Sequence, residues 1–362
     1  MTGRRGERGI ALLLVLWIFM ILGVLALDFA RYMRDDAMAA VNLADETRGY
    51  YVALAGMNRA LYDAERLRER NAAGRNAATA AAQAAQAGQP SAPEPDEEEE
   101  PLVPPDGEWH ESDFAGGRWR VRMVDEGGRI PLNKADEVLL TRVVSNLMQG
   151  GNPVAGMDQR QTKAVATVVD SILDWRDHDN LKRLNGAESE FYLKQRKPYR
   201  AKNAYFDSLE ELLLVRGVTP GLFYGADGVP GLKDIFSVYS QSHTLNVDTA
   251  PPAVLQALLG TDPAADLVEQ RNNGVPIIDT IKAQLTPIDP VLASRVASAQ
   301  APRVVRLEAY ADVTQQRNQS HVAAVVDLAA EGGEGTRVLR WLDRAPWEGP
   351  YPGRPGVAEE RG

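Results

Sequence analysis

The chain has 362 residues, more than one small core needs, which predicts at least two structural units. With 44% hydrophobic and 25% charged residues, the composition excludes wholesale disorder and a multi-span transporter. The 40 basic and 50 acidic residues give a formal charge of -10, which argues against a general nucleic-acid binder. The absence of cysteine excludes disulfide scaffolds, thiol catalysis and cysteine zinc sites, and the four histidines are too scattered for a histidine metal cluster.

An uncharged apolar run lies close to the N-terminus. Residues 10–27 contain no charged side chain and are long enough for one membrane-spanning helix. Arginines precede the run, so the positive-inside rule leaves the first residues in the cytoplasm and sends the remaining chain across the membrane. A cleaved secretory signal would have a shorter apolar core and a small-residue cleavage site, for which residues 25–28 are poor. We therefore predict a transmembrane helix over residues 10–28.

The helical pattern continues beyond the apolar run. Apolar residues recur three or four positions apart after Asp28, and no proline interrupts them before Pro90. The spacing predicts one helix that reaches about residue 70, with an amphipathic outer half over residues 29–70. Sixty residues would form a rod of roughly 90 Å. Its apolar stripe fits packing on the protein's own core at least as well as contact with a partner.

The leader that precedes the helix carries a specific resemblance. A basic leader that ends in Gly9 and leads directly into an apolar helix resembles the class III signal of type IV pilins and pseudopilins. In that family a prepilin peptidase cuts after the glycine, so the resemblance implies removal of residues 1–9 and a mature chain that begins at Ile10. Most members have a glutamate at the fifth mature position, which offsets the amino terminus of a neighbouring subunit. Here that position is Leu14, and the resemblance then points to the K-type minor pseudopilins of type II secretion systems, which lack this glutamate and lie at the filament tip.

The remaining chain divides by composition and periodicity. Residues 71–107 are rich in alanine, glutamine, proline and glutamate, which predicts a flexible linker, and we expect a flexible tail over residues 346–362. Alternating apolar residues with turn glycines predict a hairpin and three further strands, in one small antiparallel sheet formed by residues 108–132 and 303–345. Helical spacing predicts an inserted all-α domain over residues 133–302.

Within the insert, helical spacing is strongest over residues 134–148, 159–175, 208–215 and 252–259. The predicted fold class is thus α+β: a pilin-like long N-terminal α-helix packed on a small antiparallel β-sheet, interrupted by a large inserted all-α domain.

Several segments resemble the K-type family closely. They are residues 125–133, 174–179, 185–188, 191–192, 198–203, 206–217 and 245–252. The resemblance implies a minor pseudopilin at the tip of the pseudopilus, which initiates or caps assembly for export of folded proteins across the outer membrane. It also implies partners: the I-type and J-type minor pseudopilins, other pseudopilins, the inner-membrane assembly platform and the prepilin peptidase. We expect a single-pass protein of the bacterial inner membrane with its C-terminal domain in the periplasm.

Carboxylates crowd together at one place in the insert. Asp174, Asp177 and Asp179 fall within six positions, and Glu188 follows after a loop. Such hard oxygen ligands suit calcium, although the spacing is not that of an EF-hand. From the residues alone, a solvated turn after a helix is the favoured interpretation. The K-type family binds calcium at the matching loop, so the resemblance implies calcium as cofactor, with Asp177, Asp179 and Glu188 as ligands and Asp174 and Asn203 as further candidates.

Other functional classes find less support in the sequence. We find no nucleophile elbow, phosphate loop, zinc-protease motif or dinucleotide fingerprint, and we predict that the chain is not an enzyme. Residues 245–260 resemble half of a helix-hairpin-helix, but nearby acids would repel a nucleic-acid backbone, so we interpret them as a packing module and expect no nucleic-acid partner. Two alternatives stay open: a minor pilin of an adhesive or DNA-uptake type IV pilus, and a signal-anchored periplasmic calcium-binding module.

Overall fold

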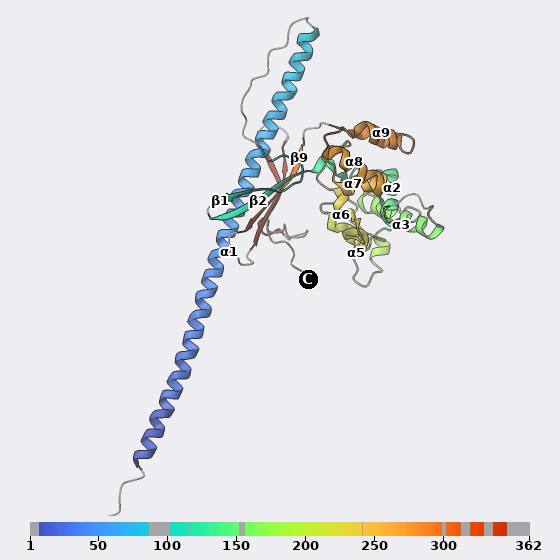
Figure 1. The fold of residues 1–362 in the computed structure, drawn as a ribbon. Helices are drawn as coiled ribbons and strands as arrows, with labels where there is room; N and C mark the ends of the chain where they lie inside the picture. Colours follow the sequence, from blue (N-terminus) through green and yellow to red (C-terminus); the bar gives the residue numbers. More distant parts are fainter. Residues whose placement is uncertain are drawn as a thin grey trace, which may run out of the picture.

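A computed structural model describes residues 7–86, 102–114, 116–151, 156–240, 242–298, 302–312, 319–328 and 336–345. A long helix, α1, runs along one side of the molecule, a sheet packs against its outer half, and a helical unit projects from the sheet away from α1 (Figure 1). The predicted α+β class is confirmed. The start of the predicted leader, residues 87–101 of the predicted linker and the predicted tail lie outside the described residues.

Helix α1 (Glu7–Gln86) has two different surfaces along its length. The large apolar side chains between Leu12 and Leu27 are each 47–72% exposed. The most apolar 18-residue window of the helix has a mean hydropathy of 2.7, and none of it is buried. Farther along, Val52, Ala53 and Met57 are buried against the sheet. The first half of α1 is thus long and apolar enough to cross a membrane, whereas the stretch from Val52 to Ala64 belongs to the folded core.

The predicted end of this helix, near residue 70, is wrong. The structure continues α1 to Gln86, so residues 71–86 are helical and do not form a flexible linker. Alanine and glutamine are strong helix formers, and the first proline stands only at Pro90. The alanine and glutamine residues of this low-complexity segment therefore continue the helix.

The sheet has five antiparallel strands in the order β1-β2-β9-β10-β11. They are β1 (His110–Phe114), β2 (Gly117–Asp125), β9 (Val304–Asp312), β10 (Gln319–Asp327) and β11 (Arg337–Leu342). The register pairs Val121 with Ala309 and Met123 with Leu307, and all four side chains are buried in the core shared with α1. The predicted hairpin and three later strands are confirmed, because each strand is long enough for the alternation of its side chains to show in the sequence.

The helical unit is inserted between β2 and β9. Its helices are α2 (Glu137–Met148), α3 (Gln159–Arg176), α4 (Ser189–Tyr192), α5 (Pro220–Tyr224), α6 (Leu232–Ile235), α7 (Pro252–Leu259), α8 (Thr261–Asn272), α9 (Ile278–Leu285) and α10 (Pro290–Arg295). Asp136 caps α2 through the Leu139 amide, and Asp158 and Gln161 form a capping box at α3. Between α7 and α8, Gly260 has φ 98°, a conformation that favours glycine.

Two details of the insert differ from the predicted all-α domain. The segment predicted as a helix over residues 208–215 is the 3-10 helix η2 (Leu209–Leu214). At its start, the Ser208 amide donates a hydrogen bond to the Glu211 carboxylate. The insert also contains three short ladders, which pair β3 (Ile130–Pro131) with β6 (Phe236–Ser237), β4 (Gly225–Ala226) with β5 (Val229–Pro230), and β7 (Leu245–Asn246) with β8 (Val296–Ala297). Strands of two residues are too short to show an alternating pattern.

Each unit has its own hydrophobic core. One core joins α1 to the sheet, and the other lies within the helical unit around residues such as Leu140, Ile172, Tyr192, Leu212 and Leu255. Because these two cores are separate, the connection between the sheet and the helical unit depends on the residues at the base of the insert.

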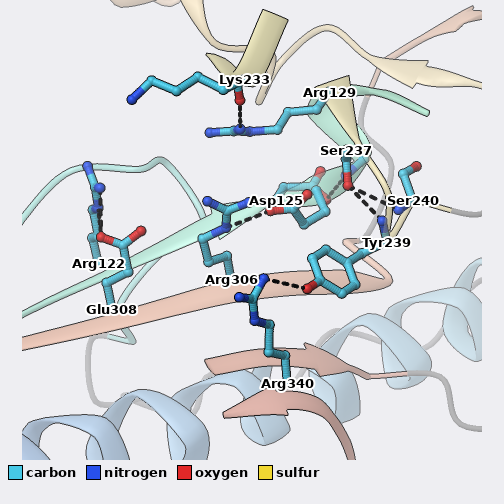
Figure 2. Close-up of polar contacts among 12 residues, drawn as sticks. Arg122, Asp125, Arg129, Lys233, Ser237, Tyr239, Ser240, Arg306, Glu308 and Arg340 are labelled. Atoms are coloured by element: carbon cyan, nitrogen blue, oxygen red, sulfur yellow. Dashed lines mark hydrogen bonds and ion pairs between the residues drawn. The ribbon is translucent and has the colours of Figure 1, made fainter. Parts of the chain in front are cut away.

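The base of the insert is a buried polar junction (Figure 2), beginning at the 3-10 helix η1 (Glu126–Gly128). Arg306 of β9 donates a hydrogen bond to Glu126 over 2.9 Å, and Glu126 is fully buried. Burial opposes ionisation of Glu126, but the positive charges of Arg306 and Arg129 outweigh it and hold the pKa of this carboxyl below its ordinary value. Arg129 donates to the carbonyl oxygen of Lys233 over 3.1 Å, so the charged group also holds α6.

Asp125 is the second buried acid of the junction. It accepts hydrogen bonds from the Gly127 amide at 2.7 Å, from Asn246 at 3.0 Å and from Thr249 at 2.7 Å. Next to it, Gly128 packs so closely that a Cβ atom would lie 2.6 Å from the carbonyl oxygen of Thr249. These contacts fix the start of the insert to the segment that leads into α7.

Candidate metal centre

The candidate site lies where α3 ends and the chain loops back to α4. Asp174, in the last turn of α3, is fully buried and accepts from the Arg183 amide at 3.2 Å. One turn earlier, Asp170 accepts from the Asn185 amide at 2.9 Å. These two acids hold the middle of the loop, and thereby position the carboxylates at its beginning and end.

Three of the predicted ligands come together. Asp177, Asp179 and Glu188 each offer a carboxylate oxygen, and these three atoms lie within 4.8 Å of one another. Both carboxylate oxygens of Glu188 and one oxygen of Asp177 are buried and have no hydrogen-bond partner among the residues that the structure describes. Burial, followed by the negative charge of Asp179, raises the pKa of Asp177. Buried acceptors without donors are costly, and a hard divalent cation would satisfy all of them.

Asn203 lies beside this carboxylate cluster. Its left-handed backbone conformation (φ 49°) turns the amide toward the loop, where the nitrogen donates to the carbonyl oxygen of Asp179 and to Asn180 Oδ1, the latter over 3.1 Å. Within the described part of the chain, the amide oxygen of Asn203 is buried and has no hydrogen-bond partner. It is therefore available as a further neutral oxygen ligand.

Asp174 has a different place from the other predicted ligands. It is not part of the group of oxygens within 4.8 Å, and it accepts the backbone bond that closes the loop. Burial raises the pKa of Asp174 to about 6. A Cβ atom on Gly186 would lie 2.0 Å from its carboxylate, so the loop needs glycine there. Asp174 thus positions the loop, as does Asp170, which sequence reasoning missed although it lies one helical turn before Asp174.

The residues of the predicted leader site lie at the start of α1. Gly9 and Ile10 are within its first helical residues, and Leu14 is 58% exposed on the apolar part of the helix. Between Leu12 and Leu27 the helix carries no acidic residue. The side chains that surround Leu14 are therefore apolar on every side of the helix.

Any affinity of the carboxylate cluster for calcium is expected to fall as the pH falls. Burial and then the charges of Asp174 and Asp177 raise the pKa of Glu188 from 4.5 to about 7. Because the folded state holds the Glu188 proton more tightly than the unfolded state does, protonation of Glu188 stabilises the fold. This contribution is complete below the unfolded-state pKa and is lost as the pH rises through about 7. Calcium must displace the proton, so the apparent Kd should rise up to about tenfold per pH unit below about pH 7. Titration calorimetry across this range checks the prediction, which a pH-independent Kd would contradict.

Comparisons with known proteins agree on one family. The family model described as "Type II secretion system (T2SS), protein K" matches residues 143–224, which include the carboxylate cluster. A curated relative, type II secretion system protein K of Pseudomonas aeruginosa PAO1, is 27% identical over 271 residues, which cover 74% of this chain and 73% of the relative. Among solved structures, a chain of the GspK-GspI-GspJ complex of the enterotoxigenic Escherichia coli type 2 secretion system is 16% identical, with a TM-score of 0.46, over 65% of this chain and 82% of that chain. The family model and the curated relative thus both show that this chain is similar to type II secretion system protein K, the first over residues 143–224 and the second over 74% of the chain.

Proposed function

We propose that this chain is the minor pseudopilin at the tip of the type II secretion pseudopilus, where it initiates or caps assembly for export of folded proteins across the outer membrane. The observation that carries the proposal is the division of α1. From Leu12 to Leu43 it exposes every large apolar side chain, and between Val52 and Ala64 it is built into the core of the sheet. A helix of this kind anchors a folded domain to a membrane and offers an apolar surface to neighbouring helices.

Two features support a terminal position. Leu14 stands where an acid would offset the amino terminus of the adjoining subunit, so this chain has no carboxylate for that pairing. The helical unit projects from the sheet well away from the membrane half of α1 (Figure 1). Such bulk beside the sheet would obstruct the addition of a further subunit above it.

The proposed partners follow from the family. The I-type and J-type minor pseudopilins would pack their helices against α1, and other pseudopilins and the inner-membrane assembly platform would contact the growing filament. The arginine-containing leader supports an inner-membrane orientation with the sheet and the helical unit in the periplasm. The role is structural, without a catalytic step.

We also propose that the carboxylate cluster binds calcium. Asp177, Asp179 and Glu188 would supply charged oxygens, and Asn203 a neutral one. The orphaned oxygens of Glu188 support this assignment, because folding buries them without any donor. Bound calcium would neutralise the repulsion among the acids and lock the loop to α3 and α4.

Processing of the N-terminus tests the membership of the filament class. In cells with prepilin peptidase, mass spectrometry of the membrane-extracted protein should find a mature chain that begins at Ile10. Gly9→Leu should retain Met1, because the peptidase requires the glycine, whereas Gly6→Leu is a matched control that should be processed normally. An intact Met1 on the unaltered protein would favour the signal-anchored calcium-binding module.

The position in the filament tests the tip assignment itself. Immunogold labelling of an epitope-tagged chain in isolated pseudopili should show label at one end of each filament. Label repeated along the shaft would contradict the proposal. Co-purification with adhesive or DNA-uptake pilus subunits, in place of type II pseudopilins, would assign the chain to another filament system.

A further inference from the structure

The loop between the predicted calcium ligands exposes two leucines. Leu184 is 90% exposed and Leu181 is 77% exposed, the highest values among the large hydrophobic side chains of the described residues. Exposing a leucine forgoes the stabilisation that its burial would bring, so two such side chains in one short loop call for a physical reason.

Hydrogen bonds prevent these leucines from turning inward. The amides on both sides of Leu184 are held, that of Arg183 by Asp174 and that of Asn185 by Asp170. The Leu181 amide donates to Asp179 over 2.7 Å. The fold therefore fixes the backbone under both leucines and presents them to the outside.

Basic residues are frequent in the segment that carries the two leucines. Residues 181–202 contain seven basic and two acidic residues, although the whole chain has a formal charge of -10. The end of this segment returns toward the loop, because the Ala201 amide donates to Ser189 over 3.1 Å and Asn203, just beyond it, donates to Asp179. Arg183 pairs with Asp174 and Glu137, and Lys194 pairs with Glu190. The exposed basic side chains are Lys182, Arg183, Lys194, Arg196, Lys197 and Arg200.

We propose that Leu181, Leu184 and these basic residues, here called the leucine loop surface, dock on an anionic lipid surface. Leucines that project from a rigid loop can enter the apolar edge of a bilayer without a matching pocket, which a protein partner would have to supply. Lysine and arginine side chains in the same segment attract anionic headgroups. Two exposed leucines in a segment rich in basic residues are thus complementary to such a membrane.

The bilayer in question is a second one, apart from the membrane that anchors α1. Between Leu27 and Val52, where α1 meets the sheet, the helix rises about 37 Å. The helical unit lies at the level of the sheet (Figure 1), so an upright chain holds the leucine loop surface far from its own anchor. The lipid surface that the leucine loop surface meets is therefore a different one from the membrane that anchors α1.

Vesicle flotation tests the proposal. The full chain, held in nanodiscs of phosphatidylcholine with calcium present, should float with vesicles that contain about 30 mol% phosphatidylglycerol and not with pure phosphatidylcholine vesicles. Salt should weaken this binding, because the basic residues act by charge. Replacing both leucines, Leu181→Asn with Leu184→Asn, should weaken it at least about tenfold. Arg196→Glu with Lys197→Glu should have an effect of similar size.

A matched pair of exposed apolar residues provides the control. Ile288 and Val291 are also three positions apart and are 60% and 54% exposed, but they lie outside the basic segment. Ile288→Asn with Val291→Asn should leave vesicle binding unchanged.

Several results would overturn the proposal. They are the absence of flotation with anionic vesicles, unaltered flotation of the double leucine variant, and an equal loss in the Ile288 and Val291 control. Binding of a polyglutamate peptide without vesicle binding would assign the surface to an acidic protein partner and would equally overturn it. Melting of each variant with and without calcium tests the calcium site, and immunogold labelling tests the tip position. Failure of either proposed function can thus be distinguished from failure of lipid binding.

Discussion

Calcium is expected to raise the melting temperature of the helical unit by about 5–10 °C at a concentration near a hundredfold its Kd. At that saturation, preferential binding to the folded state contributes about 2.7 kcal/mol, and a unit of this size gains roughly 2–4 °C per kcal/mol. Glu188→Ala or Asp177→Ala should abolish the increase, because each removes a buried oxygen that has no other partner. Differential scanning calorimetry with calcium and with chelator measures both effects.

A neighbouring glutamate supplies the control for this experiment. Glu190 lies two positions beyond Glu188, but it is exposed and pairs with Lys194 over 2.5 Å. Glu190→Ala should therefore retain the full calcium effect. Equal melting of the unaltered chain with calcium and with chelator would refute the calcium site, whatever the behaviour of the variants.

Loss of the buried charge at the junction should destabilise the protein strongly. Glu126→Gln is expected to cost about 3–5 kcal/mol, because it removes the fully buried carboxylate that balances the partly buried charges of Arg129 and Arg306. The orientation of the insert depends on the same group, so the two units should lose their fixed relation before either core melts. Thermal unfolding followed by circular dichroism, with limited proteolysis at the base of the insert, measures the two consequences.

An exposed ion pair provides a matched comparison. Glu46 contacts Arg344 over 2.8 Å at the surface, and Glu46→Gln should cost less than about 1 kcal/mol. A second change, Arg306→Met, should recover part of the stability of Glu126→Gln, because it removes one of the stranded charges. If the two glutamine variants unfolded alike, the buried pair would not hold the junction.

The sequence predicted the parts of the fold that repeat a pattern over many residues. The apolar run of α1 and the alternation in β2 and β9 extend far enough to identify the sheet and a helix that is apolar enough to cross a membrane. The sequence did not predict the two-residue strands or the 3-10 geometry of η2. Hydrogen bonds that form only in the folded structure produce them, and so short a segment carries no repeating pattern. The end of α1 was misplaced because low complexity was equated with flexibility, although alanine favours helix.

The candidate metal centre was predictable to a smaller extent. Crowding of acids pointed to Asp177, Asp179 and Glu188, which the structure does bring together. The separate place of Asp174 depends on its complete burial, which three-dimensional packing decides. The contact of Asn203 depends on a left-handed backbone conformation that no local pattern announces.

The base of the helical unit has a topological consequence. Asp125, the last residue of β2, pairs directly with Val305 near the start of β9. Neighbouring antiparallel strands lie about 5 Å apart, so the chain leaves and re-enters the sheet at almost one point. Excision of the whole insert would leave two ends that a tight turn could join, with the sheet and its register intact. The helical unit is thus an insertion between two paired strands. An ancestor could have gained, enlarged or lost it without a change in α1 or the sheet.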